Sequence, residues 1–321
     1  ARAQEVVDYG KPGQPVKLVV GYQPYWTMGF APAVLRGKEL WKKYLPAGST
    51  VEFEIGLQGA IIVNAMLAGK QHVGYLGDMP AIVSTTKESV ADLRMVAVLG
   101  LAQDVCNVLL VRKDAPQFKD AKEAIKWVGG KQFATPRGAC SDRFAQATFK
   151  KFQVEPAAYL NQSIEVITTN FKAGKLDAAV IWEPTATKLQ DEGIARRVAS
   201  GANVGESDGG FVVMRADLIK QRPDVAKAWL MAELESQLFT IDPKNAQELV
   251  QIVARQITGF SERTLWNSHY AAVPESIGGA GTKFTRPFAF TPEAMDLIGQ
   301  ATIFLHGMKA INVNKLRAEA V

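Results

Sequence analysis

The sequence contains few of the side chains from which catalytic and metal sites are usually built. Its 321 residues include only two cysteines and three histidines. No HExxH, Walker or GxGxxG pattern occurs, and no cluster of residues has metal-ligand spacing. These absences argue against a metalloprotease, a nucleotide-binding enzyme and a metal protein, and we expect neither a cofactor nor a metal.

Long apolar runs and blocks of positive charge are also missing. No run approaches the ~18 apolar residues that a membrane-spanning helix requires. The net charge is +5, but Lys and Arg are scattered along the chain, so we expect no nucleic-acid partner. The sequence begins at Ala1 without an initiator Met, which fits an exported protein, periplasmic or extracytoplasmic, whose signal segment has been removed.

Strand-like and helix-like patterns alternate along the chain. A β-branched run at 16–20 precedes helical spacing at 33–44, and the alternating run 51–55 precedes a helix at 60–68. A buried strand at 73–77 then leads into a helix that starts at Asp78. This order predicts the α/β class, with parallel strands joined by right-handed crossovers and covered on both faces.

One part of the sequence is repeated. The segment AGKQHVGYLGD at 68–78 aligns without gaps on AGKLDAAVIWE at 173–183, and each copy reads as a helix end, a strand and then an acid. In an open parallel sheet, ligands gather beyond the carboxyl ends of the strands. Two such units facing each other predict a ligand cleft between two lobes.

Several motifs in order resemble the nitrate/sulfonate/taurine family of ABC-transporter substrate-binding proteins. They are GYQPYW, AVLRGKELWKK, AMLAGKQHVGYLGDMPA, VLLVRKDAP, PRGACS, AGKLDAAVIWEP and RPDVAKAWLMA, between about Val16 and about Ile257. The resemblance implies a type II periplasmic-binding fold, in which two α/β lobes close on a small solute. It also implies delivery of this solute to a membrane permease, and because a receptor that docks on a permease works as a single copy, we expect a monomer.

Lobe boundaries follow from where the chain must cross. We expect residues 1–106 and 209–321 to form the first lobe and residues 107–208 the second, with hinge crossings near 103–110 and 207–213. The glycine- and aromatic-rich segment 259–290 is less similar to the family, and the sequence predicts no role for it.

The candidate ligand-binding residues lie in loops that follow strands or begin helices. They are Gln23, Tyr25, Trp26, Gln58, Gly77, Asp78, Arg137, Cys140, Ser141, Trp182 and Glu183. Aromatic rings offer flat apolar faces with a polar group, and helix starts offer free N–H groups to an anion. Asp78 has two interpretations, a helix N-cap or a ligand contact, and we favour the cap; for Glu183 we favour ligand contact.

The charge of the ligand stays open at this point. If both carboxylates faced the cleft unpaired, they would repel an anion, and a zwitterion, amine or polar heterocycle would be preferred. If Asp78 is a cap, Arg137 or Arg143 supplies the positive charge for an anion. Ala139 and Cys140 stand where family members commonly carry Ser-Thr, which removes hydroxyl donors and leaves Ser141. We expect a receptor for an organosulfonate, a taurine-like or a related small anionic or zwitterionic solute; the alternative is an aromatic or pyrimidine-like solute.

The two cysteines allow two further hypotheses. In an exported protein, Cys106 and Cys140 are expected to form a disulfide, although two buried thiols are the alternative. A free Cys140 at a helix start would instead suit a nucleophile, in an enzyme of the same fold. None of the three histidines stands in a recognisable cysteine–histidine arrangement, so we expect a binding protein.

Overall fold

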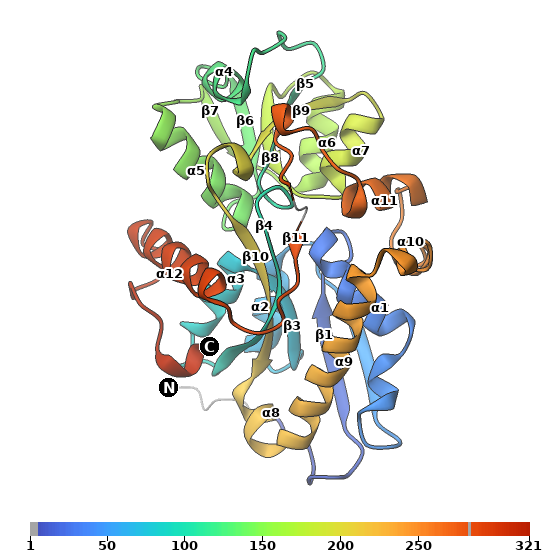
Figure 1. The fold of residues 1–321 in the computed structure, drawn as a ribbon. Helices are drawn as coiled ribbons and strands as arrows, with labels where there is room; N and C mark the ends of the chain where they lie inside the picture. Colours follow the sequence, from blue (N-terminus) through green and yellow to red (C-terminus); the bar gives the residue numbers. More distant parts are fainter. Residues whose placement is uncertain (1–5, 282–283) are drawn as a thin grey trace.

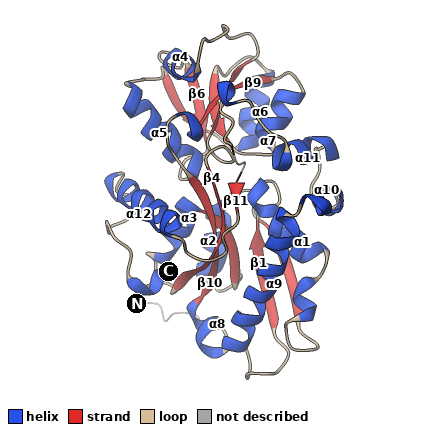
Figure 2. Ribbon diagram, in the orientation of Figure 1, coloured by secondary structure: helices blue, strands red, loops and turns tan. Residues whose placement is uncertain are grey.

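The computed structural model describes residues 6–281 and 284–321, so the Ala1–Gln4 start lies outside the described residues. Two α/β lobes stand one above the other, each built on its own sheet (Figure 1). Helices cover both faces of the sheets (Figure 2). The α/β class and the two-lobed fold predicted from the sequence are confirmed.

The first lobe contains a six-stranded sheet. Its order is β11 (Phe284–Thr285), β4 (Leu93–Ala102), β10 (Asp208–Arg215), β3 (Val73–Gly77), β1 (Lys17–Tyr22) and β2 (Thr50–Ile55). The strands β1, β2 and β3 are parallel, whereas β10 runs antiparallel to both β3 and β4. Every residue of β3 and β10 is buried, as expected for central strands covered on both faces.

The second lobe repeats this arrangement. Its sheet has the order β7 (Ala158–Asn161), β6 (Gln132–Thr135), β8 (Ala178–Ile181), β5 (Val108–Arg112) and β9 (Ala195–Ser200). The parallel strands β7, β6 and β8 correspond to β2, β1 and β3, so the two copies of the sequence repeat occupy equivalent places. The antiparallel strand β5 corresponds to β10. The prediction of parallel pairing was therefore wrong for these two strands, because each enters its sheet from the other lobe.

Helices follow most of the strands. They are α1 (Phe30–Gly37), α2 (Gly59–Leu67), α3 (Asp78–Thr85), α4 (Ala121–Trp127), α5 (Cys140–Phe152), α6 (Ile164–Lys172), α7 (Thr185–Asp191), α8 (Ala216–Gln221), α9 (Pro223–Ile241), α10 (Ala246–Ala254), α11 (Glu262–Tyr270) and α12 (Pro292–Gly307). The helix expected at 33–44 is interrupted, because Glu39 adopts a left-handed φ of 50° before the short 3-10 turn Leu40–Lys43. Among the described residues, none of these helices has the length and apolarity to span a bilayer.

The chain passes between the sheets twice, between Ala102 and Val108 and between Ser200 and Asp208. Residues 259–281 and 284–290, which we call the bridging segment, also contact both lobes. Gly278 O accepts hydrogen bonds from Arg197 Nη2 at 3.1 Å and Ser200 Oγ at 2.6 Å in the second lobe. Farther along the segment, β11 pairs with β4 of the first lobe. The expected boundaries placed this whole segment in the first lobe and did not include its contacts with the second.

Candidate ligand-binding site

A cavity of about 280 Å³ is lined by residues from both lobes. This volume is close to the lower end of the ~300–1,000 Å³ range of small-molecule sites. Seven of the sequence-predicted residues line it: Gln23, Trp26, Gln58, Gly77, Arg137, Cys140 and Trp182. Four more lining residues belong to the two helix starts that the sequence indicates as anion-binding loops: Gly59, Ala60, Gly138 and Ala139. The others were not predicted as contacts: Val63, Asn64, Leu67, Pro80, Val83, Lys87, Cys106 and Pro136.

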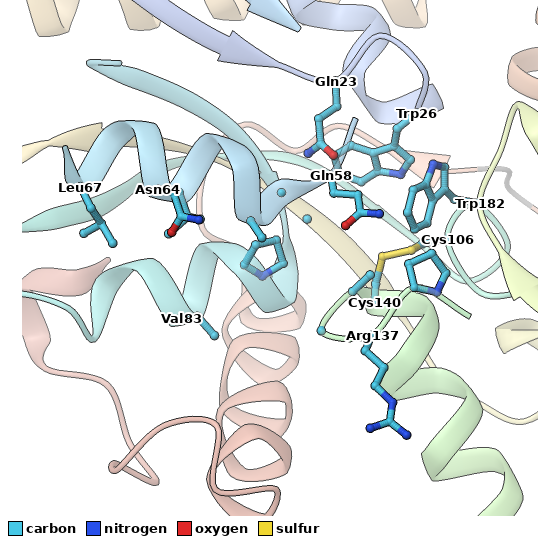
Figure 3. A pocket seen from close by; sticks show the side chains of 18 of the residues that line it. Gln23, Trp26, Gln58, Asn64, Leu67, Val83, Cys106, Arg137, Cys140 and Trp182 are labelled. Carbon is cyan, nitrogen blue, oxygen red and sulfur yellow. A yellow bond between two sulfur atoms is a disulfide. The ribbon is translucent and has the colours of Figure 1, made fainter. Parts of the chain in front are cut away.

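Two tryptophans and the disulfide stand at one end of the cavity (Figure 3). Trp26 follows β1 and is only 4% exposed, and its indole packs over the glycines of two neighbouring strands. A Cβ on Gly210 would come within 2.6 Å of the Trp26 ring, so this position requires glycine. Trp182 follows β8, the counterpart of β3, and stands where the first copy of the repeat has Gly77. The carboxyl ends of β1 and β8 therefore position the two indoles.

Two helix starts also line the cavity. The N-cap residues of α2 and α5 are Gln58 and Ala139, and neither makes a side-chain capping bond. Gly138 precedes α5 with a left-handed φ of 78°, and its N–H donates to Asp142 Oδ2 at 3.0 Å, which fixes the loop. Helix starts that lack side-chain caps present free N–H groups and a partial positive charge, an environment that favours an anion.

Asp78 does not cap α3, so that prediction was wrong. The N-cap residue is Gly77, without a side-chain bond. The Asp78 carboxylate pairs instead with Arg143 of the second lobe, with Oδ2 and Nη2 2.9 Å apart, and both side chains are buried. The same oxygen accepts the Gly209 N–H at 3.2 Å. Asp78 lies behind the cavity and is an ionic contact between the lobes.

Glu183 is fully buried and does not line the cavity either. Its Oε1 pairs with Arg197 Nη1 at 3.0 Å, and its Oε2 accepts the Thr187 N–H at 2.9 Å in the first turn of α7. This geometry favours a structural role over the expected ligand contact. The Glu183 main-chain oxygen also accepts the Thr27 N–H at 3.0 Å, a direct hydrogen bond between the lobes.

Two more expected contacts lie outside this cavity. Ser141 is buried, and its Oγ is 3.0 Å from Thr135 Oγ1, so its hydroxyl supports the loop before α5. Tyr25 lines a neighbouring cavity of about 410 Å³, and its hydroxyl accepts the Thr258 N–H at 3.1 Å. Trp182 lines both cavities and stands between them.

The lining carries positive charge without negative charge. Lys87 and Arg137 line the cavity and are exposed, and the lining among the described residues contains no Asp or Glu. Arg137 stacks against Tyr159, with its guanidinium carbon 5.6 Å from the ring centre. Because Asp78 and Glu183 are paired inside the protein, neither opposes an anion in the cavity by direct contact.

Cys106 and Cys140 form the predicted disulfide, with Cα atoms 6.1 Å apart. The bond lines the cavity and joins the first crossing to the start of α5. Cys140 therefore lacks the free thiol that a nucleophile requires, which argues against the enzyme hypothesis. No group of three His, Cys, Asp or Glu side chains in the described part of the chain converges as a metal site does.

Replacing both cysteines with alanine is expected to lower the free energy of unfolding by ~3–4 kcal/mol, because the disulfide closes a loop with a sequence separation of 34 and restricts the unfolded chain. Urea denaturation with and without dithiothreitol measures this difference. Reductant should destabilise the natural chain and leave the double variant unchanged. Equal stability of the natural chain in both conditions would contradict the prediction.

The sequence model of the NMT1-like family matches residues 11–254. The chain belongs to this family. The taurine-binding periplasmic protein of Escherichia coli (strain K12) is 24% identical over 253 residues, which are 74% of this chain and 73% of that protein. The nitrate/sulfonate/taurine resemblance expected from the sequence motifs is thus confirmed.

Solved structures share the fold. The alkanesulfonate-binding protein from Xanthomonas axonopodis pv. citri bound to MOPS has a TM-score of 0.76 at 17% identity, over 96% of this chain and 98% of that one. The periplasmic nitrate-binding protein from Synechocystis PCC 6803 has a TM-score of 0.67 at 18% identity, over 88% and 75%. All three similar proteins are binding proteins, and this chain shares the fold of the two solved structures.

Proposed function

We propose that this protein is an extracytoplasmic receptor that captures a small organic sulfonate without an ammonium group and delivers it to the permease of an ABC importer. The family and its sulfonate- and taurine-binding members support the receptor role. The absence of an ammonium group in the ligand is argued from the cavity of this chain.

The distribution of charge carries the proposal. The cavity is lined by two cations, two uncapped helix starts and no carboxylate among the described residues. A sulfonate at the helix starts gains from their free N–H groups and from Arg137, and Lys87 adds positive charge farther along the cavity. The ammonium of taurine would lose hydration without meeting an opposite charge, and burying an unpaired charge is costly. The surrounding Trp26, Trp182 and aliphatic side chains suit an apolar body.

Capture is proposed to work by closure of the two lobes. The two crossings act as hinges, and the ligand bridges α2 of the first lobe and α5 of the second. The Asp78–Arg143 pair and the Thr27–Glu183 hydrogen bond already join the lobes in this structure, so the ligand adds contacts to an interface that the protein itself forms. The closed form is the one presented to the permease.

Calorimetric titration with ethanesulfonate, taurine and propylamine tests the proposed charge preference. Ethanesulfonate should bind more tightly than taurine, which differs from it by the ammonium group, and propylamine should not bind. Tighter binding of taurine than of ethanesulfonate would contradict the preference. Binding of a neutral pyrimidine such as uracil, with no binding of any sulfonate, would favour the alternative solute class.

Arg137→Gln is expected to weaken ethanesulfonate binding about fivefold, the effect of removing ~1 kcal/mol of attraction from a charge near the surface. The control is Arg263→Gln, which removes an exposed arginine of α11 outside the cavity and should leave affinity unchanged. Titration of both variants with the same sulfonate measures the difference. Equal affinities of the two variants would show that Arg137 does not contribute to sulfonate binding.

A further inference from the structure

Helix α2 has a composition that its surroundings do not explain. Its sequence GAIIVNAML contains no charged residue and one polar side chain, Asn64. A helix this apolar is normally buried all round. Here Ile62, Val63 and Met66 are buried, whereas Ala60, Ile61 and Asn64 are exposed and Leu67 is half-buried. Part of an apolar helix is thus left uncovered by protein.

The cavity extends along this helix. Its lining includes Ala60, Val63, Asn64 and Leu67, which have the i, i+3, i+4, i+7 spacing of one helix face. The neighbouring α3 contributes Pro80 and Val83, three residues apart on its own facing side. The two helices are close at their starts, because a Cβ on Gly59 would come within 2.4 Å of Pro80 Cγ. Between them runs a groove, which we call the α2–α3 groove.

The α2–α3 groove is continuous with the proposed anion site. Figure 3 shows Leu67, Asn64 and Val83 toward one end of the cavity, the tryptophans and the disulfide at the other, and Gln58 between them. From Ala60 to Leu67 the helix rises ~10 Å. A ligand whose head group lies at the helix starts therefore has a path leading away from that head group along α2, apolar except for Asn64.

We propose that the α2–α3 groove binds an extended hydrocarbon chain attached to the anionic head group, so that chain length determines specificity. This inference rests on the proposed function, because the sulfonate fixes the end from which the chain extends. Val63, Leu67 and Val83 form its apolar walls. Lys87 is exposed at the outer end, so a chain longer than the groove enters water there and gains no further affinity.

Titration with ethane-, butane-, hexane- and octanesulfonate tests this inference. Each added methylene should raise affinity about two- to fourfold until the groove is filled, because burying a CH₂ group in an apolar site is favourable by that amount. Val83→Trp narrows the groove and should weaken octanesulfonate at least tenfold while ethanesulfonate changes less than twofold. Leu67→Asn makes the wall of the groove polar at similar size and should likewise weaken octanesulfonate more than ethanesulfonate. This variant replaces Val83→Trp in the test if the latter does not fold.

Val166→Trp is the matched control. Val166 is 45% exposed on α6 and does not line the cavity. This variant should therefore show the same dependence of affinity on chain length as the natural chain. Equal affinity for all four sulfonates, or equal weakening of the short and long ones by Val83→Trp, would overturn the proposal that the groove binds the hydrocarbon chain. The proposed receptor function would still stand. No binding of any sulfonate would overturn the proposed function and the groove together.

Discussion

Arg197→Met is expected to lower the free energy of unfolding by ~3–5 kcal/mol. Arg197 is 2% exposed and pairs with Glu183 Oε1 at 3.0 Å and with Asp104 Oδ2 at 3.2 Å. Removing one partner from a buried ionic group leaves the others charged and desolvated, and this cost far exceeds the loss of packing. The bridging segment loses a contact as well, because Arg197 also donates to the main-chain oxygen of Gly278.

Urea denaturation followed by circular dichroism measures this effect. Arg255→Met removes an exposed arginine from the C-terminal end of α10 and should change stability by less than ~0.5 kcal/mol. Arg197→Lys keeps the charge and loses the forked geometry of the guanidinium. Its free energy of unfolding should therefore lie between those of the natural chain and Arg197→Met. If Arg197→Met matched Arg255→Met, the buried ionic group would contribute little to stability.

Asp208→Asn is expected to stabilise the protein at neutral and higher pH. Asp208 begins β10 and is fully buried, its Oδ2 accepting the Cys106 N–H at 3.1 Å. Burial, and next the Asp78 carboxylate, raise the pKa of Asp208 to about 7. The folded protein thus holds a proton that the unfolded chain has released, so stability from this group is present at low pH and is lost as pH rises from about 4 to about 7.

The difference in unfolding free energy between Asp208→Asn and the natural chain isolates this group. It should be near zero at about pH 4 and increase by up to ~1.4 kcal/mol per pH unit toward about pH 7. Asp296→Asn, at an exposed position of α12, should show no such increase. A difference for Asp208→Asn that does not vary with pH would show that Asp208 is ionised in the folded protein throughout.

A second buried group, His72, changes the stability of the natural chain with pH in the opposite direction to Asp208. Burial, and then the charge of Arg215, lower the pKa of His72 to about 4, and its Nδ1 accepts the Val19 N–H at 3.0 Å. As pH falls, the unfolded chain protonates this histidine at about pH 6.5, before the folded protein does at about pH 4. The stability that His72 contributes therefore rises with pH between about 4 and about 6.5. The two slopes offset each other, and Asp208→Asn should therefore reveal a dependence on pH that the natural chain hides.

The sequence predicts the two-lobed fold and the place of the cavity because both depend on local signals. Strand patterns, helix starts and the repeat at 68–78 and 173–183 place Trp26, Trp182 and the loop before α5 beyond the carboxyl ends of strands in the two sheets. The disulfide follows from having only two cysteines in a chain expected to be exported. Each of these inferences uses residues that are close in sequence or equivalent between the copies.

The ionic partners of Asp78 and Glu183 could not be predicted in this way. Arg143 is 65 residues from its partner Asp78. Arg197 is 14 residues from its partner Glu183, with a helix between them, and nothing in the local sequence distinguishes either arginine from exposed ones. Only the docking of the lobes brings Arg143 to Asp78. The spacing of Ala60, Val63, Asn64 and Leu67 is visible in the sequence as a helix face, but the fold decides that this face lines the cavity.

The bridging segment adds to the attachments between the two lobes. Gly278 accepts a hydrogen bond from the second lobe, and β11 pairs with a strand of the first. The lobes are thus joined by noncovalent contacts of this segment as well as by the two crossings of the chain.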